Sequence, residues 1–406
     1  MSVRKVKWET AKGASTRWLV DYRDQTGERR GKNFVRKRDA EDFAAKVKVE
    51  VAAGTHVPES TTVTVSEACD LWLHSCRSRN LETSTLTQYD QHVRLHIKPF
   101  LGATKLSRIA VATVRAFEDR LREEGRSQPM VRGIVASLSS VVSDAEERGL
   151  IGRNPVRELS RRRGANGKAN GRRKLQVGVD IPTPDEIRRI MNNAKGLKKR
   201  TCLLSLITTG LRASEFRGLR WDDLDLDPRK PELHVRQRAD FRNEIGAPKS
   251  SAGTRTIPLT PRVASSLRLW RDRACPKKDG KLVYVFPNGR GNIESTGNIV
   301  KRLWWPAQIA AGVTKPVLDD EGQPKHDDEG KPIVKAKYPG LHSLRHFFAS
   351  WCINRKADGG LELPAKLVQE RVGHASVTMT LDRYGHLFPR GDDTSELAKA
   401  EKALLG

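Results

Sequence analysis

The sequence lacks any long apolar run, and only 37% of its 406 residues are hydrophobic. A helix that crosses a membrane needs about 20 consecutive, mostly apolar residues, so a membrane-spanning protein is not expected. The first residues, MSVRKVKWETAKG, are basic but contain no apolar stretch, and no signal peptide is expected there. These absences predict a cytoplasmic protein.

The sequence also lacks the common patterns for metals, disulfides and nucleotides. Its cysteines are odd in number, scattered and never in a C-x-x-C pair, which favours reduced thiols; they are Cys69, Cys76, Cys202, Cys275 and Cys352. His92 and His96 have i, i+4 spacing, but no cysteine or carboxylate completes a metal site, so they are interpreted as surface or phosphate-facing histidines. No G-x-x-x-x-G-K-[ST] loop is present. We therefore expect neither a bound metal nor a cofactor.

Acidic residues are outnumbered by basic ones, 49 to 75, which gives a formal net charge of +26. A charge of this size predicts a polyanionic partner. Nucleic acid is the leading candidate, because no basic amphipathic anchor supports the alternative of an anionic membrane surface. The length predicts two or three domains.

Residues 1–58 form a small, strongly basic segment. The runs TRWLVDYRD and GKNFVRK predict strands, and QTGERR between them, with Gly27, predicts a hairpin turn. DAEDFAAKVKVEVAAG predicts a helix that begins near Asp39 and ends at Gly54. We expect a small α+β domain, a hairpin or three-stranded sheet packed on one helix, and its clustered basic residues favour contact with DNA.

Residues 63–158 have helical periodicity throughout and predict an all-α domain of four helices. The expected helices are SEACDLWLHSCRS with Ser66 as its cap, STLTQYDQHVRLHIKPFLG ending at Pro99 and Gly102, VATVRAFEDRLREEG, and QPMVRGIVASLSSVVSDAEERG. The last of these is the clearest, because its apolar residues recur at i, i+3, i+4 and i+7.

Residues 159–177 contain the basic, glycine-rich stretch SRRRGANGKANGRRK, which predicts a flexible linker along a phosphate backbone. Residues 178–390 then predict a mixed α/β, mainly helical domain. Its expected helices are TPDEIRRIMNNAKG, KRTCLLSLITTG, HSLRHFFASWCINR, AKLVQERVG and SVTMTLDRYG, and its expected strands are ELHVRQ and TRTIPLT. Residues 313–338 repeat a short motif, LDDEGQPK and HDDEGKPI, and predict an exposed hairpin or loop without a role in chemistry.

Residues 391–406 form the C-terminal tail. Ser395 can cap a short helix there, whose apolar stripe would consist of Leu397, Ala400, Leu404 and Leu405. A helix this short is marginal alone in water. We therefore expect it to dock, either on the 178–390 domain of its own chain or on a neighbouring copy of the chain.

Several residues of the 178–390 domain suit the cleavage of a DNA phosphodiester without a metal. Bidentate arginines stabilise the charge that develops on the phosphate oxygens, and the leaving 5′ oxygen needs an acid. Arg212 stands in TTGLRASEFRGLRW, at a turn into a helix, with Glu215 three residues on to hold it rigid. Lys249, in GAPKSSAG, lies at the mouth of an expected hairpin, where a flexible ammonium can reach a leaving group.

The second group of candidates lies near the end of this domain. LHSLRH places His342 and Arg345 on one helix face, and His374 precedes Tyr384 by ten residues. Each has an ordinary alternative: an arginine can be a solvated charge, and His342 with His346 could be a metal pair that lacks the acid of H-E-x-x-H. Tyr384 could cover a core edge, since a phenol with a pKa of about 10 is a poor nucleophile without charged neighbours.

Together, these residues resemble the catalytic signature of the tyrosine recombinase, or phage integrase, family. The ordered set is Arg212, Lys249, His342, Arg345, His374 and Tyr384. The flanking stretches TGLRASE, HSLRHFFAS and VGHASVTMTLDRYGHL match as well. Residues 63–158 are similar to the SAM-like core-binding domain of that family, and residues 1–58 to the arm-binding domain of phage-type integrases.

The resemblance implies that Tyr384 attacks a DNA phosphate and forms a 3′-phosphotyrosyl link with a free 5′-hydroxyl. It implies that Arg212, Arg345 and His374 bind the phosphate, that Lys249 is the general acid and that His342 assists proton transfer. The implied partners are double-stranded attachment sites, further copies in a homotetramer, an excisionase and a host DNA-bending protein. A type IB topoisomerase and a non-catalytic DNA-binding regulator are the alternatives. The basic N-terminal segment favours recombination over the former, and the complete catalytic set argues against the latter.

Overall fold

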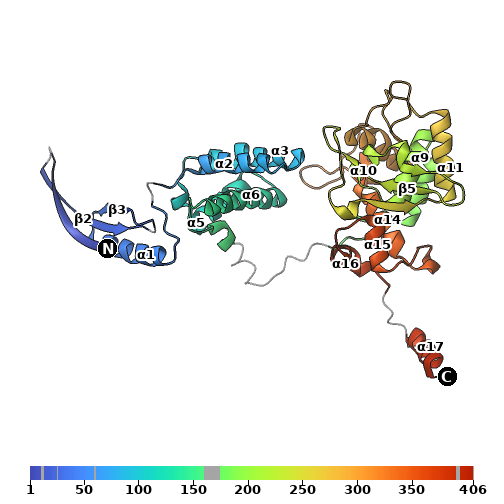
Figure 1. The fold of residues 1–406 in the computed structure, drawn as a ribbon. Helices are drawn as coiled ribbons and strands as arrows, with labels where there is room; N and C mark the ends of the chain where they lie inside the picture. Colours follow the sequence, from blue (N-terminus) through green and yellow to red (C-terminus); the bar gives the residue numbers. More distant parts are fainter. Residues whose placement is uncertain (11–12, 25, 59–60, 160–173, 390–393, 406) are drawn as a thin grey trace. The chain divides into compact units, whose positions relative to one another are not determined.

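The computed structural model describes residues 1–10, 13–24, 26–58, 61–159, 174–389 and 394–405. The chain is multi-domain, as expected, and divides into two compact units, Met1–Asn170 and Gly171–Gly406 (Figure 1). The predicted basic linker lies almost entirely outside the described residues. Among the helices that are described, none is long and apolar enough to cross a membrane.

The first unit begins with a three-stranded antiparallel sheet and one helix. Strands β1 (Ser2–Thr10), β2 (Gly13–Arg23) and β3 (Arg29–Phe34) pair in the order β1-β2-β3, and α1 (Lys37–Ala52) packs on the sheet. The helix begins two residues before the expected Asp39. The hydrophobic core between the sheet and this helix consists of Val20, Tyr22, Ala40, Ala44 and Val47.

The rest of the first unit is helical. The helices are α2 (Val65–Ser78), α3 (Thr83–His92), α4 (Lys98–Leu101), α5 (Val111–Glu123) and α6 (Gln128–Glu147). Thr64, and not the expected Ser66, caps α2, because Thr64 and Glu67 form a reciprocal capping box. A π-helical turn, Val93–Ile97, joins α3 to α4, so that Pro99 lies at the start of α4 and the helical run ends before Gly102.

The interpretation of His92 and His96 as surface histidines is wrong. Both are buried, and the Nδ1 atom of His92 lies 2.8 Å from the Ser137 hydroxyl on α6. Burial lowers the pKa of both histidines, so both are neutral parts of the helical core. The signal in the sequence that could have indicated this is that each histidine directly precedes a core residue of the same helical run, Val93 or Ile97.

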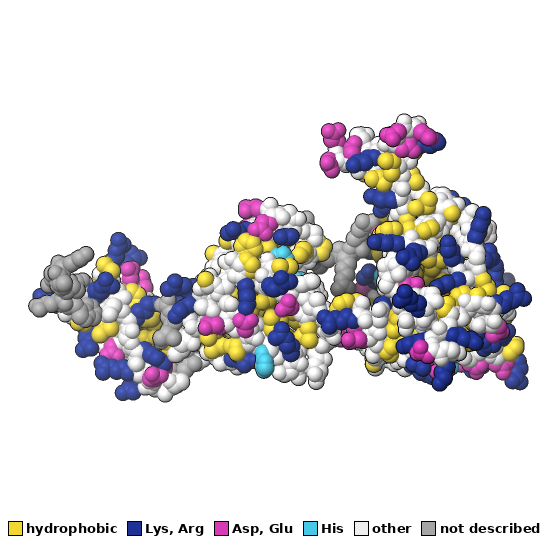
Figure 2. Space-filling model, turned by 90° about the horizontal axis from the view of Figure 1, so that it is seen from above, with side chains coloured by type: hydrophobic (Ala, Val, Ile, Leu, Met, Phe, Trp, Pro, Cys, Tyr) yellow, Lys and Arg dark blue, Asp and Glu magenta, His cyan; other side chains and the backbone are white. Residues whose placement is uncertain are grey.

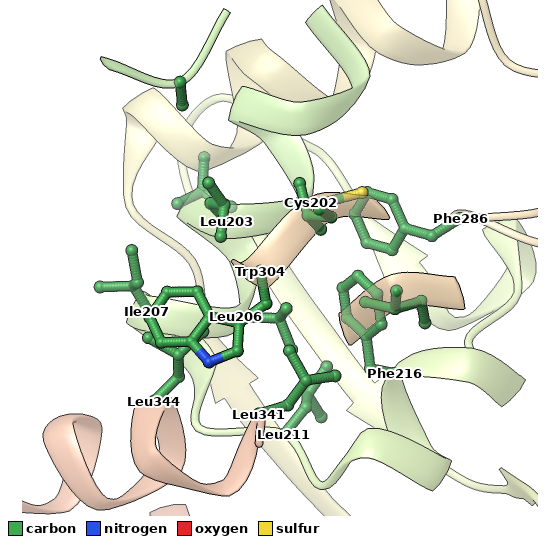
Figure 3. Close-up of a cluster of buried hydrophobic side chains, with 14 of the residues drawn as sticks. Cys202, Leu203, Leu206, Ile207, Leu211, Phe216, Phe286, Trp304, Leu341 and Leu344 are labelled. Carbon is green, nitrogen blue, oxygen red and sulfur yellow. The ribbon is translucent and has the colours of Figure 1, made fainter. Parts of the chain in front are cut away.

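The second unit has a helical core with a small sheet. Its helices are α8 (Pro184–Asn193), α9 (Leu197–Thr209), α10 (Ala213–Gly218), α11 (Pro261–Arg273), α12 (Thr296–Ile299) and α13 (Trp305–Ala310). The sheet contains β4 (Leu224–Asp225), β5 (Glu232–Val235) and β8 (Arg255–Pro258), paired in the order β4-β5-β8. Between β5 and β8, strands β6 (Arg238–Ala239) and β7 (Ile245–Gly246) form a separate hairpin. Figure 3 shows Leu203, Leu206 and Ile207 of α9 around the buried Trp304.

Three C-terminal helices close the second unit. They are α14 (His342–Ile353), which packs on α9, followed by α15 (Ala365–Val372) and α16 (Val377–Tyr384). Their own apolar cluster includes Phe348, Val368, Val372 and Tyr384. The expected tail helix is α17 (Thr394–Leu405), which begins one residue before Ser395 and leaves Leu397, Leu404 and Leu405 exposed.

Residues 313–338 form the expected exposed hairpin. Strands β9 (Thr314–Pro316) and β10 (Val334–Ala336) pair antiparallel at its base. The sequence repeat is also a structural repeat: Asp319 and Asp327 each accept two backbone N–H groups through Oδ1, at 2.8–3.0 Å. Figure 2 shows acidic side chains gathered on a projection of the second unit.

Candidate active site

The C-terminus of α15 gathers three arginines. Each arginine donates a hydrogen bond to one of three successive carbonyl oxygens. Arg255 Nε donates to Arg371 at 2.9 Å, Arg345 Nη2 donates to Val372 at 2.6 Å, and Arg212 Nη2 donates to Gly373 at 2.7 Å. The last carbonyls of a helix have no partners within it and carry partial negative charge. They therefore fix three cations from three different elements in one place.

Gly373 makes this arrangement possible. It ends α15 in the left-handed conformation, with φ +72°. A Cβ atom at this position would lie 2.9 Å from Arg255 Nη1 and 3.0 Å from the carbonyl oxygen of Ala252. Only glycine combines the required backbone conformation with the absence of that atom.

Glu215 is the buried counter-charge of two of these arginines. Its carboxylate accepts from the Arg212 backbone N–H at 2.9 Å, from Arg212 Nη1 at 2.6 Å and from Arg255 Nη2 at 2.9 Å. Burial alone would raise the pKa of Glu215, but Arg255 and Arg212 outweigh it and lower the pKa overall. Arg212 is the N-cap residue of α10, as the turn in the sequence indicated, and Glu215 holds both its backbone and its side chain.

Arg345 and Arg212 differ in exposure. Arg345 is 2% exposed and also donates from Nη1 to the carbonyl oxygen of Gly210 at 2.8 Å. Burial lowers the pKa of Arg345 to about 9, which leaves it charged at neutral pH. The Arg212 side chain keeps 26% of its surface exposed. An anion at this site can therefore reach Arg212 from solvent, while Arg345 supplies charge from within.

Tyr384 is the last residue of α16 and is 1% exposed. Its hydroxyl lies 2.6 Å from Nδ1 of His346. Burial raises the pKa of Tyr384 to about 12, although Arg345 and Arg383 act to lower it. In this arrangement, the tyrosine is a neutral phenol with a histidine as its direct hydrogen-bond partner.

Two histidines, His346 and His374, contact this tyrosine, and the more exposed His342 contacts His346. The ring of His374 lies parallel to that of Tyr384, with centroids 6.1 Å apart, and its Nδ1 lies 2.9 Å from the Thr380 hydroxyl. The rings of His342 and His346 meet edge to face at 4.5 Å. Burial, together with neighbouring positive groups, lowers the pKa of His374 to about 4 and that of His346 to about 3. Partial burial and Arg345 lower the pKa of His342 too.

Lys249 is the one sequence-predicted residue that the structure does not join to the others. It lies exposed between β7 and β8, six residues before Arg255, and makes no hydrogen bond or ion pair with any described residue. The remaining five are brought together by the end of α15, by α14 and by α16. Lys249 is thus close in sequence to Arg255, but it lies on a loop and its side chain is exposed to solvent.

Sequence reasoning missed three residues of this site. Arg255 was assigned only to a strand, although a basic residue at the start of an apolar strand was a usable signal. His346 was considered only as half of a metal pair, yet it shares a face of α14 with His342 and follows Arg345 directly. Nothing in the sequence indicated that the charge of Arg383 would act on the histidines.

Comparisons with known proteins agree on the family. Residues 182–390 match the model described as the phage integrase family, and residues 64–122 match the N-terminal SAM-like domain of phage integrases. A tyrosine recombinase XerC-like protein of Caldanaerobacter subterraneus is 24% identical over 397 residues, which cover 91% of each chain.

Solved structures share the fold. The Tn1549 transposon integrase bound to transposon right-end DNA has a TM-score of 0.59 at 21% identity, and the match covers 84% of this chain and 100% of that chain. A lambda integrase dimer bound to a core site has a TM-score of 0.54 at 20% identity and covers 95% of both. Because the phage integrase model matches more than half of the sequence, this chain belongs to the phage integrase family of tyrosine recombinases.

Proposed function

We propose that this chain is a site-specific DNA recombinase that integrates or excises a phage or another mobile element. The observation that carries the proposal is the gathering of Arg212 and Arg345 at the end of α15. His374 follows directly and lies parallel to the buried Tyr384, whose hydroxyl is bonded to a histidine. Two guanidinium groups and a histidine suit a phosphodiester, and the phenol supplies a nucleophile.

The phosphate site is organised before DNA arrives. Glu215 and the carbonyl groups at the end of α15 hold the two guanidinium groups, so little reorganisation is needed when charge develops on the phosphate oxygens. Arg212, Arg345 and His374 bind these oxygens, and Glu215 supports the arginines without contacting DNA.

The chemistry exchanges one phosphodiester for another. The Tyr384 oxygen attacks phosphorus, the bond from phosphorus to the 5′ oxygen breaks, and Lys249 protonates the departing oxygen. His342 assists in proton transfer. The product is a 3′-phosphotyrosyl link with a free 5′-hydroxyl, and a 5′-hydroxyl from the partner strand reverses the step. Because the bond energy is conserved in the covalent link, no nucleotide cofactor is needed.

The domains divide the DNA-binding work. Residues 63–158 act as the core-binding domain and residues 178–390 as the catalytic domain, joined by the basic linker 159–177. Four copies assemble on paired double-stranded attachment sites in the cytoplasm, associated with the nucleoid. An excisionase and a host DNA-bending protein are the expected accessory partners. Residues 1–58 bind separate arm-type sites. A protein without these residues should still bind the crossover core DNA but should no longer bind and protect the arm-type sites.

The tail carries the contact between copies. The tail helix α17 leaves Leu397, Leu404 and Leu405 exposed, at 72–83% of their full surface. A short helix with an apolar face of this kind is stable only when another protein surface covers that face. We assign the neighbouring protomer of the tetramer as its partner, so that assembly controls which subunits cut.

The decisive experiment traps the covalent intermediate on nicked DNA that carries a candidate attachment site. A cut next to the nick releases a short fragment and leaves the protein attached to the 3′ end. Tyr384→Phe loses only a hydroxyl, so it should bind DNA normally and form no adduct. Adduct from this variant at the wild-type level would place the nucleophile elsewhere. Relaxation of DNA without sequence preference would instead indicate a topoisomerase, and binding without any adduct a regulator.

A further inference from the structure

The hydrogen bond between His346 and Tyr384 has no role in the chemistry described so far. His346 lies on α14, one residue after Arg345, and is 6% exposed. Its Nδ1 is 2.6 Å from the Tyr384 oxygen, which is the distance at which a general base contacts the proton that it removes. No other side chain among the described residues forms a hydrogen bond with that hydroxyl.

The charged and titratable groups that act on His346 come from its own helix and from the segment that ends in Tyr384. They are His342 and Arg345 on α14, His374 before α16, and Arg383 and Tyr384 on α16. The cations among them, together with burial, keep the imidazole neutral. A neutral imidazole that carries its proton on Nε2 presents an unprotonated Nδ1, which can accept from the phenol.

We propose that His346 orients the Tyr384 hydroxyl and accepts its proton during attack on DNA. The inference rests on the proposed function. In this step the proton moves from the Tyr384 oxygen to His346 Nδ1 as the bond from that oxygen to phosphorus forms. The bond from phosphorus to the 5′ oxygen breaks, and Lys249 gives its own proton to that oxygen. When the 5′-hydroxyl of the partner strand attacks phosphorus in the reverse step, its proton returns to Lys249, the bond from phosphorus to the tyrosine oxygen breaks, and His346 returns its proton to Tyr384.

The arrangement also links the proton transfer to phosphate binding. The positive charges of Arg345 and Arg383 oppose a further positive charge on His346. A phosphodiester bound by Arg212 and Arg345 adds a negative charge beside them, which stabilises an imidazolium at His346. The tyrosine is therefore activated where a phosphate is present and stays a neutral phenol elsewhere.

The main test variant is His346→Asn. An asparagine amide can occupy the place of Nδ1 and keep a hydrogen bond to the phenol, but it cannot take up a proton at neutral pH. Cleavage at pH 7 should slow by about 10²- to 10⁴-fold, while binding of core-site DNA stays within twofold. His346→Ala serves as a second variant, in which added imidazole should restore part of the cleavage rate.

The rate should be measured against pH on DNA with sulfur in place of the bridging 5′ oxygen. Sulfur leaves without a proton, so this substrate removes the contribution of Lys249 and should not rescue His346→Asn. Above pH 7, the rate of His346→Asn should rise about tenfold per pH unit, because the population of phenolate then limits the attack. The wild-type rate should rise much less steeply.

The matched control is His92→Asn, which alters another buried histidine bonded to a hydroxyl, 2.8 Å from Ser137 in the first unit. It should lose comparable stability and keep the wild-type pH profile. A wild-type rate in His346→Asn, or an equal defect at every pH, would overturn the inference. Because Tyr384→Phe tests the nucleophile separately, an inactive Tyr384→Phe beside a normal His346→Asn would refute only the role of His346.

Discussion

Replacement of Gly373 by alanine tests whether the end of α15 organises the arginines. Gly373 has φ +72°, where an alanine costs about 1–2 kcal/mol. Its Cβ atom would also meet Arg255 Nη1 at 2.9 Å and the Ala252 carbonyl oxygen at 3.0 Å. Arg255 cannot simply turn away, because its guanidinium is bonded to Glu215 and to two carbonyl oxygens. Such crowding typically adds about 1–3 kcal/mol.

Gly359 provides the matched control in the same unit. It has φ +77°, and nothing lies within 4 Å of a Cβ atom built on it. Gly359→Ala therefore has the backbone cost alone and should lose about 1–2 kcal/mol of unfolding free energy. Gly373→Ala should lose about 1–3 kcal/mol more, and for a unit of this size each kcal/mol lowers the Tm by about 2–4 °C.

The two variants should differ more in cleavage than in stability. The carbonyl group of Gly373 holds Arg212, and a misplacement of about 1 Å in a catalytic group can cost about 10²-fold in rate. Thermal unfolding and the rate of adduct formation on nicked DNA, measured below the lower Tm, give the two readouts. If Gly373→Ala matched Gly359→Ala in both, the end of α15 would not organise the site.

Four further outcomes are expected. Lys249→Ala should cleave normal DNA very slowly and recover most of its rate on the 5′ sulfur substrate; an equal defect on both substrates would exclude Lys249 as the acid. Glu215→Gln should lose about 3–5 kcal/mol of unfolding free energy in urea at pH 7, because Arg255 and Arg212 lose their buried counter-charge. Since the folded pKa of Glu215 is lowered, that difference should persist above the unfolded pKa and shrink as the pH falls through the folded one. The second unit should itself lose stability below about pH 6.5, the unfolded pKa of histidine, because the folded pKa values of His346 and His374 are about 3 and about 4. Each of the two should cost about 1.4 kcal/mol of unfolding free energy per pH unit. Urea unfolding at pH 7 and pH 5 checks this, and equal stability at both would contradict it. Deletion of residues 391–406 should leave core-site binding by single protomers intact and impair synaptic complexes in native gels, whereas normal assembly and recombination would show that α17 does not join protomers.

The sequence allowed the local features of this site to be predicted, because they depend on short spacings. His342 and Arg345 share a helix face by their i, i+3 spacing, and the carboxylate of Glu215 is within reach of Arg212 for the same reason. The apolar positions of α6 were likewise readable from the i, i+3, i+4, i+7 pattern. The buried ones are Val131, Ile134, Leu138, Val141, Val142 and Ala145, whereas Val135 is only partly buried. Such contacts depend on helical geometry alone.

The contacts between distant segments could not be predicted in this way. Arg255, Arg345 and Arg212 meet at the end of α15 only after β8, α14 and α10 have packed around it. The capping of α2 by Thr64 was missed for another reason, since both Thr64 and Ser66 are good capping residues and only the partner, Glu67, decides between them. His92 and His96 were misassigned because a buried neutral histidine is indistinguishable by type from an exposed one.

The burial of Tyr384 follows from the same packing. It explains how a recombinase can contain a tyrosine nucleophile that stays unreactive in the absence of DNA. A phenol with a pKa of about 12 must gain about 7 kcal/mol to ionise at pH 7, whereas one with the ordinary value of about 10 needs about 4 kcal/mol. Burial therefore suppresses the phenolate, and Arg345, which would favour it, is held by the carbonyl groups of Gly210 and Val372. In the mechanism that we propose, a phosphodiester at Arg212 and Arg345 supplies both the electrophile and the negative charge that lets His346 take the proton. Because the same anion provides both, attack by Tyr384 is confined to DNA that is already bound by the arginines.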